Sequence, residues 1–456
     1  MVYIVYRLRF MRLNLTILSV SGFRGIVGYD LNPVELVNIG RPFGNFIRNC
    51  SCAIGRDTRN SSIMVLHTVM AGLLEANCDI LDFGIVSTPA LFREVARRNL
   101  EGGLMITASH NPPEWNGLKF IVKGGRGVFE EELSSLLSPN LTFLSSKIGS
   151  YSEVSSIYPE ELVVYIGKDS CSGLKVSLDL GGGSGSLFAP KLFKEIGCKV
   201  STLNDSPGIF SRTIDPIEDE LKGLSESIVA NGFDVGFAYD CDADRVAIVD
   251  EKGRKLPADF TLMLSLNYLM RERRLRNVVT SVDTSMGLEE MVNDLGGKVF
   301  YAKVGEANVV MEMMKRGCKV GGEGSSGGLI LADFVLCRDG VLASALISKM
   351  IKQEGKLSDL IKGLPYYHQI RKKIPCNKND AKKVLSILIQ EQPNVDTKDG
   401  IKFKQEDSWI LIRPSRTEEV LRLSVEAKSE DRAEEIMNSY LKRINSIMRD
   451  DLGRSS

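Results

Sequence analysis

The segment MITASHNPPEWNGLKF, residues 105–120, begins as an apolar strand and becomes polar at a serine that is followed by a histidine. Two consecutive prolines, Pro112 and Pro113, fix φ and remove two backbone donors, so they force the chain into an extended or turning path. Ser109 therefore lies in a stiffened loop. On this segment alone, Ser109 is a hydrolase nucleophile, a carrier of phosphate or only part of a turn.

A hydrolase triad at this serine is disfavoured. Neighbouring residues of an extended segment point apart, so His110 is expected to face away from Ser109. The other two histidines, His67 and His368, have no suggestive surroundings, and the chain has no G-x-S-x-G elbow. A serine that carries phosphate would instead need a metal ion and cationic partners.

The segment YDCDADRVAIVD offers such a metal site. Asp240, Asp242 and Asp244 alternate, so in an extended segment they would project to one side. A divalent cation would relieve their repulsion, and ligands that are all oxygen suit Mg²⁺. An EF-hand is excluded because Arg245 stands where its glycine is required and strands flank the loop. The alternative is a solvated acidic turn, and Arg245 is a candidate phosphate ligand beside the metal.

A third polar segment, RPSRTEE at 413–419, lies between two apolar runs. Arg413, Ser415 and Thr417 alternate and could offer a guanidinium and two hydroxyls to a phosphate, although a polar hairpin turn would look alike. The glycine-rich segments 180–186 and 321–328 match neither a P-loop nor a dinucleotide fingerprint.

Composition excludes several classes of protein. The chain has 456 residues, which predicts about three or four domains. Its 58 basic and 58 acidic residues cancel, which gives no support for a nucleic-acid or membrane-surface binder. The nine scattered cysteines and three histidines disfavour a zinc site or a disulfide framework. No apolar run reaches membrane-spanning length, and the expected location is the cytoplasm.

The elements that would position these loops repeat three times. Residues 52–83, 174–203 and 277–305 each read as strand, Gly/Ser/Thr-rich loop, amphipathic helix and strand, which is the βαβ pattern of a layered α/β domain. An apolar strand, a polar loop and another apolar strand follow each unit. The three polar loops carry the serine, the aspartates, and a glutamate with serines, so three related domains could present them to one cleft. The alternative is three unrelated hairpins.

The end of the chain departs from this pattern. It reads as a small α+β domain with helices at 380–390 and 430–449 and with strands at 400–404, 408–412 and 420–425. The predicted division of the chain into four domains, each with one polar loop, is 1–152, 153–255, 256–365 and 366–456.

Taken together, the motifs TASHNPPEWNGLK, DCDADR, GGEGSSGG and RPSRTEE resemble those of the α-D-phosphohexomutase superfamily in order and spacing. The segments SGFRG (21–25), GRDTR (55–59) and GIVSTPA (84–90) look like its first domain, so the resemblance covers nearly the whole chain. It implies three topologically related α/β domains around a central cleft and a C-terminal α+β domain that resembles the TATA-binding protein.

The resemblance also implies roles for individual residues. Ser109 would be a phosphoserine, and its phosphate would share one Mg²⁺ with Asp240, Asp242 and Asp244. Three further residues match the family's active-site cations: Arg24, Lys119 and Arg245. His110 and Lys119 are both candidates for the general acid/base. Other positions match the substrate-binding loops: Lys303 in the specificity loop, Glu323 and Ser325 for sugar hydroxyls, and Arg413, Ser415 and Thr417 for the phosphate that is not transferred.

The implied reaction interconverts hexose 1-phosphate and hexose 6-phosphate through a hexose 1,6-bisphosphate, which also acts as activator, with mannose, glucose or glucosamine as the sugar. Two alternatives are a magnesium-dependent sugar phosphatase with an aspartate nucleophile and a non-catalytic sugar-phosphate sensor. The expected state is a monomer or a homodimer.

The chain departs from the family's motifs at several places. Ser326 and glycines follow Ser325 where histidine is frequent, Glu306 stands in the specificity loop, and Arg416 replaces a common glycine. These differences leave the identity of the sugar open. Relatives begin close to the SGFRG segment, so Met11 is an alternative start to Met1.

Overall fold

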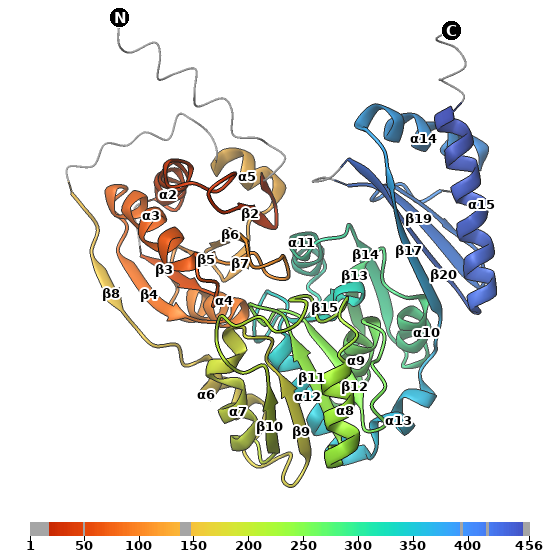
Figure 1. The fold of residues 1–456 in the computed structure, drawn as a ribbon, viewed down its shortest axis with the longest axis horizontal. Helices are drawn as coiled ribbons and strands as arrows, with labels where there is room; N and C mark the ends of the chain where they lie inside the picture. Colours follow the sequence, from red (N-terminus) through yellow and green to blue (C-terminus); the bar gives the residue numbers. More distant parts are fainter. Residues whose placement is uncertain (1–17, 49–50, 137–146, 393–394, 416–418, 450–456) are drawn as a thin grey trace, which may run out of the picture.

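The computed structural model describes residues 18–48, 51–136, 147–392, 395–415 and 419–449, and every structural statement below refers to these residues. Their strands form four sheets, which follow one another along the chain (Figure 1). The predicted α/β fold class with a C-terminal α+β unit is confirmed.

The first sheet has the strand order β1-β2-β6-β5-β3-β4-β8, and β7 pairs with β6. Apolar residues occupy the central strands β3 and β5 because helices pack on them. The strands are β1 (Leu18–Ser19), β2 (Gly22–Ile26), β3 (Cys52–Arg56), β4 (Ile80–Ile85), β5 (Gly102–Ile106), β6 (Trp115–Val122), β7 (Arg126–Gly127) and β8 (Tyr151–Glu153). The helices are α2 (Pro33–Phe46), α3 (Ser62–Glu75), α4 (Thr88–Arg97) and α5 (Glu130–Leu136).

The second and third sheets share one topology. Their strand orders are β10-β9-β11-β12 and β14-β13-β15-β16, with the last strand antiparallel in each. The same arrangement, β4-β3-β5-β6, lies inside the first sheet, so the predicted threefold repeat is confirmed. A single glycine-rich or polar loop connects the antiparallel pair each time, which brings three loops of different chemistry to equivalent places.

The elements of these two sheets follow in chain order. The second contains α6 (Tyr158–Ile166), β9 (Lys175–Asp179), η1 (Ser184–Leu187), α7 (Ala189–Glu195), β10 (Lys199–Leu203), α8 (Lys222–Asn231), β11 (Val235–Tyr239) and β12 (Val246–Asp250). The third contains α9 (Asp259–Arg273), β13 (Asn277–Ser281), α10 (Met286–Asp294), β14 (Lys298–Ala302), α11 (Glu306–Arg316), β15 (Val320–Glu323), η2 (Gly324–Ser326), β16 (Gly328–Leu331), α12 (Gly340–Glu354), α13 (Leu357–Leu360) and η3 (Ile361–Gly363).

The fourth sheet is antiparallel throughout, with the order β17-β20-β19-β18. Helices α14 and α15 lie on its outer face, away from the other sheets (Figure 1). The elements are β17 (His368–Pro375), α14 (Lys378–Glu391), β18 (Ile401–Lys404), β19 (Ser408–Pro414), β20 (Val420–Ala427) and α15 (Glu430–Arg449). Strand β17 was not predicted, and the other five elements lie close to their predicted bounds. Among the described residues, no helix is both long and apolar enough to cross a membrane.

Apolar packing joins the first three sheets more closely than the fourth. One buried cluster runs from Ala53 through Val176 to Val278, whereas the fourth sheet has a core of its own. The division at 152/153 stays a prediction, and β8 of the first sheet extends one residue beyond it, to Glu153. A small apolar contact that includes Trp409 attaches the fourth sheet to the third.

Substitution of two adjacent glycines, Gly124 and Gly125, tests the packing against α4, which begins beside the aspartate loop. Gly124 and Gly125 both have positive φ, at 86° and 69°. A methyl group on Gly124 would meet nothing within 4 Å, but one on Gly125 would lie 2.3 Å from the carbonyl oxygen of Phe92 in α4. We expect Gly125→Ala to lose about 1–3 kcal/mol more stability than Gly124→Ala in urea denaturation. Equal losses would contradict this packing.

Glu426 makes the attachment of the fourth sheet dependent on pH. This buried carboxylate of β20 accepts hydrogen bonds from the Ser285 hydroxyl and from the Met286 N–H. Burial raises its pKa from 4.5 to about 7. The folded protein therefore keeps a proton that the unfolded chain releases, so stability falls as pH rises from about 4.5 to about 7, by about 3 kcal/mol at most.

We expect the melting temperature of the wild type to fall between pH 5 and pH 8 relative to that of Glu426→Gln, whose side chain at position 426 does not titrate. Glu434→Gln changes an exposed carboxylate of α15 and should leave the pH dependence of the wild type unaltered. Parallel curves for wild type and Glu426→Gln would show that Glu426 does not control this dependence.

Candidate active site

A cavity of about 1050 Å³ lies where the polar loops of the four sheets meet. Half of the predicted site residues line it: Arg24, His110, Lys119, Arg245, Glu323, Ser325 and Arg413. Ser109 and the three aspartates are fully or almost fully buried directly behind this lining. Lys303 is exposed and does not line the cavity, nor does Ser415, and Thr417 and Arg416 lie outside the described residues.

A buried arginine shapes the serine loop. The guanidinium of Arg59, in the GRDTR segment, pairs with Asp57 and donates hydrogen bonds to the carbonyl oxygens of Ser109 and Asn111 at 2.8 and 2.6 Å. The Ser109 N–H donates to Thr107 Oγ1 at 2.8 Å. These contacts stabilise Ser109 at φ 52°, in the left-handed region that a serine rarely adopts. The loop is therefore fixed by its neighbours as well as by its prolines.

This backbone conformation makes one sequence expectation wrong. His110 does not face away from Ser109, because the left-handed turn brings its Nδ1 to 3.4 Å from Ser109 Oγ. Burial lowers the pKa of His110 well below its usual value, and the nearby cations Arg245 and Arg24 lower it further. The imidazole is therefore neutral at pH 7.

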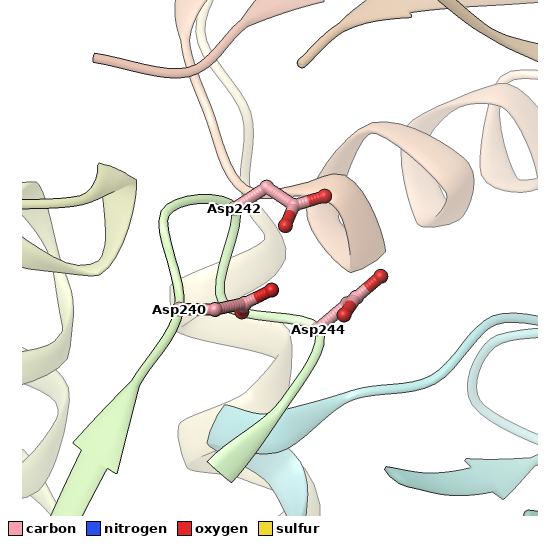
Figure 2. Close-up of side chains that lie close together, drawn as sticks. All are labelled: Asp240, Asp242 and Asp244. Carbon is pink, nitrogen blue, oxygen red and sulfur yellow. The ribbon is translucent and has the colours of Figure 1, made fainter. Parts of the chain in front are cut away.

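The three aspartates form a tight buried group on the loop between β11 and β12. One carboxylate oxygen from each lies within 4.8 Å of the others, and Figure 2 shows the side chains converging from one turn. The loop is not extended as expected, because Ala243 has φ 56° and turns the chain. Ser109 Oγ donates a hydrogen bond to Asp240 Oδ2 at 2.8 Å, so the serine and this group adjoin.

These carboxylates fit a cation site. Asp242 Oδ1 and Asp244 Oδ1 are buried and have no hydrogen-bond partner among the described residues. Burial, together with the charges of Asp242 and Asp244, raises the pKa of Asp240 well above its usual value. Unpartnered buried carboxylate oxygens are costly, and a divalent cation with oxygen ligands would satisfy them.

Three predicted cations surround this group. Lys119 Nζ on β6 lies 2.7 Å from both Asp242 Oδ2 and Asp244 Oδ2. Arg24 donates to the side-chain oxygen of Asn111 at 3.0 Å. Arg245 pairs with an aspartate outside the group, Asp215, at 2.8 Å. The Nε atoms of both arginines are buried without a hydrogen-bond partner among the described residues, and Arg245 Nε lies 4.0 Å from Asp244 Oδ1.

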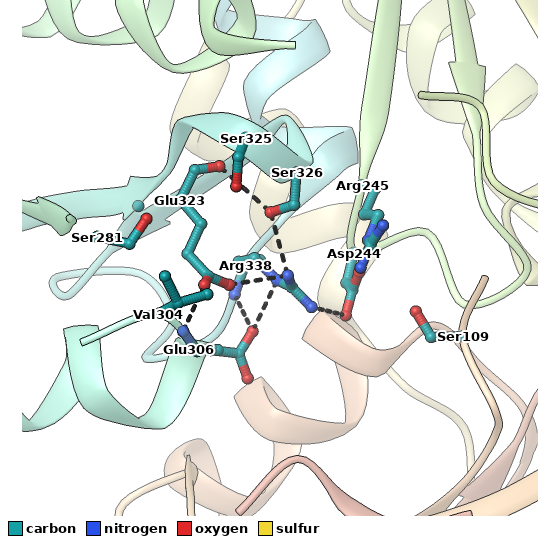
Figure 3. A network of polar contacts seen from close by, with 12 residues as sticks. Ser109, Asp244, Arg245, Ser281, Val304, Glu306, Glu323, Ser325, Ser326 and Arg338 are labelled. Atoms are coloured by element: carbon teal, nitrogen blue, oxygen red, sulfur yellow. Dashed lines mark hydrogen bonds and ion pairs between the residues drawn. The ribbon is translucent and has the colours of Figure 1, made fainter. Parts of the chain in front are cut away.

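Sequence reasoning missed Arg338, which connects two of the loops. Its guanidinium lies 2.9 Å from Asp244 Oδ2, 2.9 Å from Glu323 Oε2 and 3.3 Å from Glu306 Oε2, as Figure 3 shows. Burial acts to raise the pKa of Asp244, but the charges of Arg338 and Lys119 outweigh it and lower that pKa. The sequence did offer one signal for Arg338: two consecutive charged residues, Arg338 and Asp339, stand between the buried elements β16 and α12, where charge is rare.

The loop that contains Glu323 and Ser325 also contacts a residue that was not predicted, Asp283. Glu323 Oε1 accepts a hydrogen bond from the Gly305 N–H at 2.7 Å, which connects β15 to the specificity loop. Ser325 Oγ donates to Asp283 Oδ2 at 2.9 Å. Asp283 lines the cavity beside Glu306, from the loop that connects β13 to α10.

The fourth sheet contributes the largest group of cations. Arg413 Nη1 lies 3.0 Å from Asp399 Oδ2, and the same oxygen accepts from the Val304 N–H at 3.0 Å. Four further basic residues of this sheet line the cavity and were not predicted: Arg371, Lys372, Lys373 and Arg422. They alternate or adjoin on β17 and β20, but so do solvent-exposed cations of ordinary strands, so the sequence alone gave no reason to select them.

The cavity therefore joins two differently charged regions. On one side a serine adjoins three carboxylates that suit a divalent cation. On the other side the fourth sheet presents several cations that suit a phosphate. This arrangement can hold a molecule with an anionic group at each end.

Comparison with known proteins agrees with this geometry. Four family models match successive parts of the chain: phosphoglucomutase/phosphomannomutase alpha/beta/alpha domain I at 16–138, domain II at 156–253, domain III at 257–367, and the C-terminal domain at 372–442.

Relatives match along nearly the full length. A probable phosphoglucosamine mutase of Pyrococcus horikoshii is 34% identical over 443 residues, which cover 94% of this chain and 98% of that protein. A phosphoglucomutase/phosphomannomutase of Thermococcus kodakarensis is 34% identical over 449 residues with the same coverage. The crystal structure of a phosphoglucomutase/phosphomannomutase family protein from Burkholderia thailandensis has a TM-score of 0.84 at 24% identity, covering 95% of this chain and 98% of that one.

The relatives cover 94% of the chain, and the four matched family models follow the order of the four sheets. The chain belongs to the phosphoglucomutase/phosphomannomutase family and is a phosphohexomutase, an isomerase that transfers phosphate within its substrate.

Proposed function

We propose that the protein interconverts hexose 1-phosphate and hexose 6-phosphate through a phosphoserine at Ser109 and a hexose 1,6-bisphosphate intermediate. The observation that carries this proposal is the contact between Ser109 Oγ and Asp240, which places a serine beside a buried carboxylate group at a cavity with a basic far side. A serine in this setting suits a phosphate carrier better than a hydrolase nucleophile.

Phosphoryl transfer proceeds in two halves. First, the bond between phosphorus and Ser109 Oγ breaks and a bond forms between phosphorus and the free hydroxyl oxygen of the sugar; the hydroxyl proton leaves to a general base, and Ser109 Oγ takes up a proton. The bisphosphate then turns end for end. In the second half, the bond between the other phosphorus and its sugar oxygen breaks and a bond to Ser109 Oγ forms, while Ser109 gives up its proton and the sugar oxygen takes one up. Positioning and charge neutralisation supply most of the rate enhancement.

Asp240, Asp242 and Asp244 would hold Mg²⁺ with an oxygen of the phosphoserine. Bound there, Mg²⁺ supplies positive charge that neutralises the transferring phosphate. Arg24 and Arg245, whose buried Nε atoms make no hydrogen bond among the described residues, would contact phosphate oxygens on the same side.

His110 and Lys119 both remain candidates for the general acid/base. His110 Nδ1 lies 3.4 Å from Ser109 Oγ, and Lys119 Nζ contacts two of the aspartates and lines the cavity. Both are within reach of a hydroxyl that approaches the phosphoserine.

The far end of the substrate would be held by the fourth sheet. Arg413, with Ser415 and Thr417, is proposed to bind the phosphate that is not transferred, and Arg371 and Arg422 add charge to the same wall. Glu323 and Ser325 would bind the sugar between the two ends, with Lys303 in the adjacent specificity loop. Among the three candidate sugars, the naming of several relatives as probable phosphoglucosamine mutases favours glucosamine phosphate.

Replacement of the serine tests the carrier role. We expect Ser109→Ala to lower mutase activity about 1,000-fold or more, because the phosphate would have no acceptor on the protein. Intact-mass measurement should detect one phosphate on the wild type, mapped to Ser109, and none on the variant. Ser134→Ala, which changes an exposed serine of α5, is the matched control. Hydrolysis of the sugar phosphate that Ser109→Ala leaves undiminished would favour an aspartate phosphatase. Sugar-phosphate binding without turnover by the wild type would favour a sensor.

Metal removal tests the carboxylate group. We expect EDTA to abolish activity and Mg²⁺ to restore it. We also expect Asp242→Asn, which removes one charge at nearly constant volume, to raise the Mg²⁺ concentration for half-maximal activity by about tenfold or more. Asp205→Asn, at an exposed aspartate in the loop after β10, should leave this concentration unchanged. Equal Mg²⁺ binding by wild type and Asp242→Asn in titration calorimetry would exclude this site.

A further inference from the structure

Asp283 is a carboxylate of the cavity wall with no role in the mechanism above. It lies in the loop between β13 and α10, and only 8% of it is exposed. The cavity lining nevertheless includes it, together with Glu306, Glu323 and Ser325. It therefore faces the part of the cavity where the sugar is proposed to bind.

The two hydrogen bonds that Asp283 accepts come from neutral hydroxyl groups, and its charge attracts that of Lys402 without a direct ion pair in the described part of the chain. Oδ1 accepts from the Ser281 hydroxyl at 2.6 Å, and Oδ2 accepts from the Ser325 hydroxyl at 2.9 Å. Among the described residues, no lysine or arginine forms an ion pair with it. The nearby Lys402 donates to the carbonyl oxygen of Val282 at 2.6 Å and lies over the ring of Trp409.

Two further carboxylates, Glu306 and Glu323, line the cavity, although its wall as a whole also carries many cations. Asp283, Glu306 and Glu323 line the same region, and Arg338 is the one guanidinium that pairs directly with any of them among the described residues. Burial raises the pKa of Glu323, Arg338 opposes this effect, and the charge of Asp283 adds to it. A cation bound here would relieve this excess of negative charge.

Hydrogen-bonding capacity narrows the choice of cation. A carboxylate can only accept, so Ser325 must direct its hydroxyl proton at Asp283 and turn its oxygen lone pairs to other donors. Glu323 likewise accepts, from the Gly305 N–H and from Arg338, and each of its oxygens keeps a further lone pair. Figure 3 shows Glu323 and Ser325 close together in the chain, with the Glu323 carboxylate turned toward Arg338. These side chains thus offer acceptors, whereas an ammonium group offers three donors and no acceptor.

We propose that Asp283, with Ser325 and Glu323, forms a subsite for an ammonium substituent on the hexose ring, so that Asp283 determines specificity for a 2-amino-2-deoxyhexose phosphate. A hydroxyl or an acetamido group satisfies such a site less well, because each brings an acceptor of its own and no positive charge. This assignment rests on the proposed mutase function and on the sugar-binding role of the loop that contains Glu323.

The test compares substrates that differ in this substituent. Wild type and Asp283→Asn are assayed with the 1-phosphates of glucosamine, N-acetylglucosamine, glucose and mannose, each with its matching bisphosphate. The amide keeps the size of the carboxylate and can still accept from Ser325. Asp333→Asn, at an exposed aspartate paired with Lys319, is the matched control, and thermal melting checks that each variant folds.

We expect wild type and Asp333→Asn to prefer glucosamine 1-phosphate over glucose 1-phosphate and N-acetylglucosamine 1-phosphate in kcat/KM. In Asp283→Asn, that preference should fall by about 10- to 100-fold, mainly through KM for the amino sugar, which is the range expected for loss of a charge-assisted hydrogen bond. A purely structural aspartate would lower kcat/KM for all four sugars by a common factor, and this outcome would overturn the proposal.

The wild-type assay keeps the proposal falsifiable even if Asp283→Asn does not fold. Turnover of glucose or mannose phosphate without preference for the amino sugar would overturn the ammonium subsite and leave the mutase function standing. Absence of turnover with every sugar, in the presence of Mg²⁺ and bisphosphate, would instead overturn the proposed function itself.

Discussion

The site depends on how the fold balances buried negative charge. Asp240, Asp242 and Asp244 lie on one turn with a carboxylate oxygen of each within 4.8 Å of the others, an arrangement that would be unfavourable without cations. Lys119 from the first sheet and Arg338 from the third provide that balance, at 2.7 and 2.9 Å. The aspartate loop of the second sheet is therefore stable only when the neighbouring sheets are in place, which makes assembly of the domains a condition for the site.

The same contacts connect the two ends of the cavity. Arg338 joins Asp244 to Glu323, and Glu323 joins the specificity loop through Gly305. The adjacent Val304 N–H donates to Asp399, which also pairs with Arg413. A continuous series of polar contacts thus runs from the proposed metal site to the proposed phosphate site. It fixes their separation, which in the proposed mechanism must suit each end of the substrate in turn.

Repetition of one topology explains how different chemistry reaches one place. In each of the first three sheets, a loop connects the last antiparallel pair, and it carries Ser109, the aspartates or Glu323. Because the framework is the same, the loop residues can differ without cost to the strands that hold them. The fourth sheet lacks this repeat and attaches through a small contact, with Glu426 as a buried carboxylate sensitive to pH.

The sequence by itself determined the repeated βαβ units, the α+β end of the chain and the loops with Ser109, Asp240 and Glu323, because periodicity and short-range spacing are local properties. Only the tertiary structure decided which side chains meet. Arg338 and Asp283 escaped prediction because single charged residues acquire meaning only from partners distant in the chain, and His110 was placed wrongly because Arg59 helps stabilise Ser109 in a left-handed turn. Burial and charge balance are properties of the assembled cavity, and no local pattern encodes them.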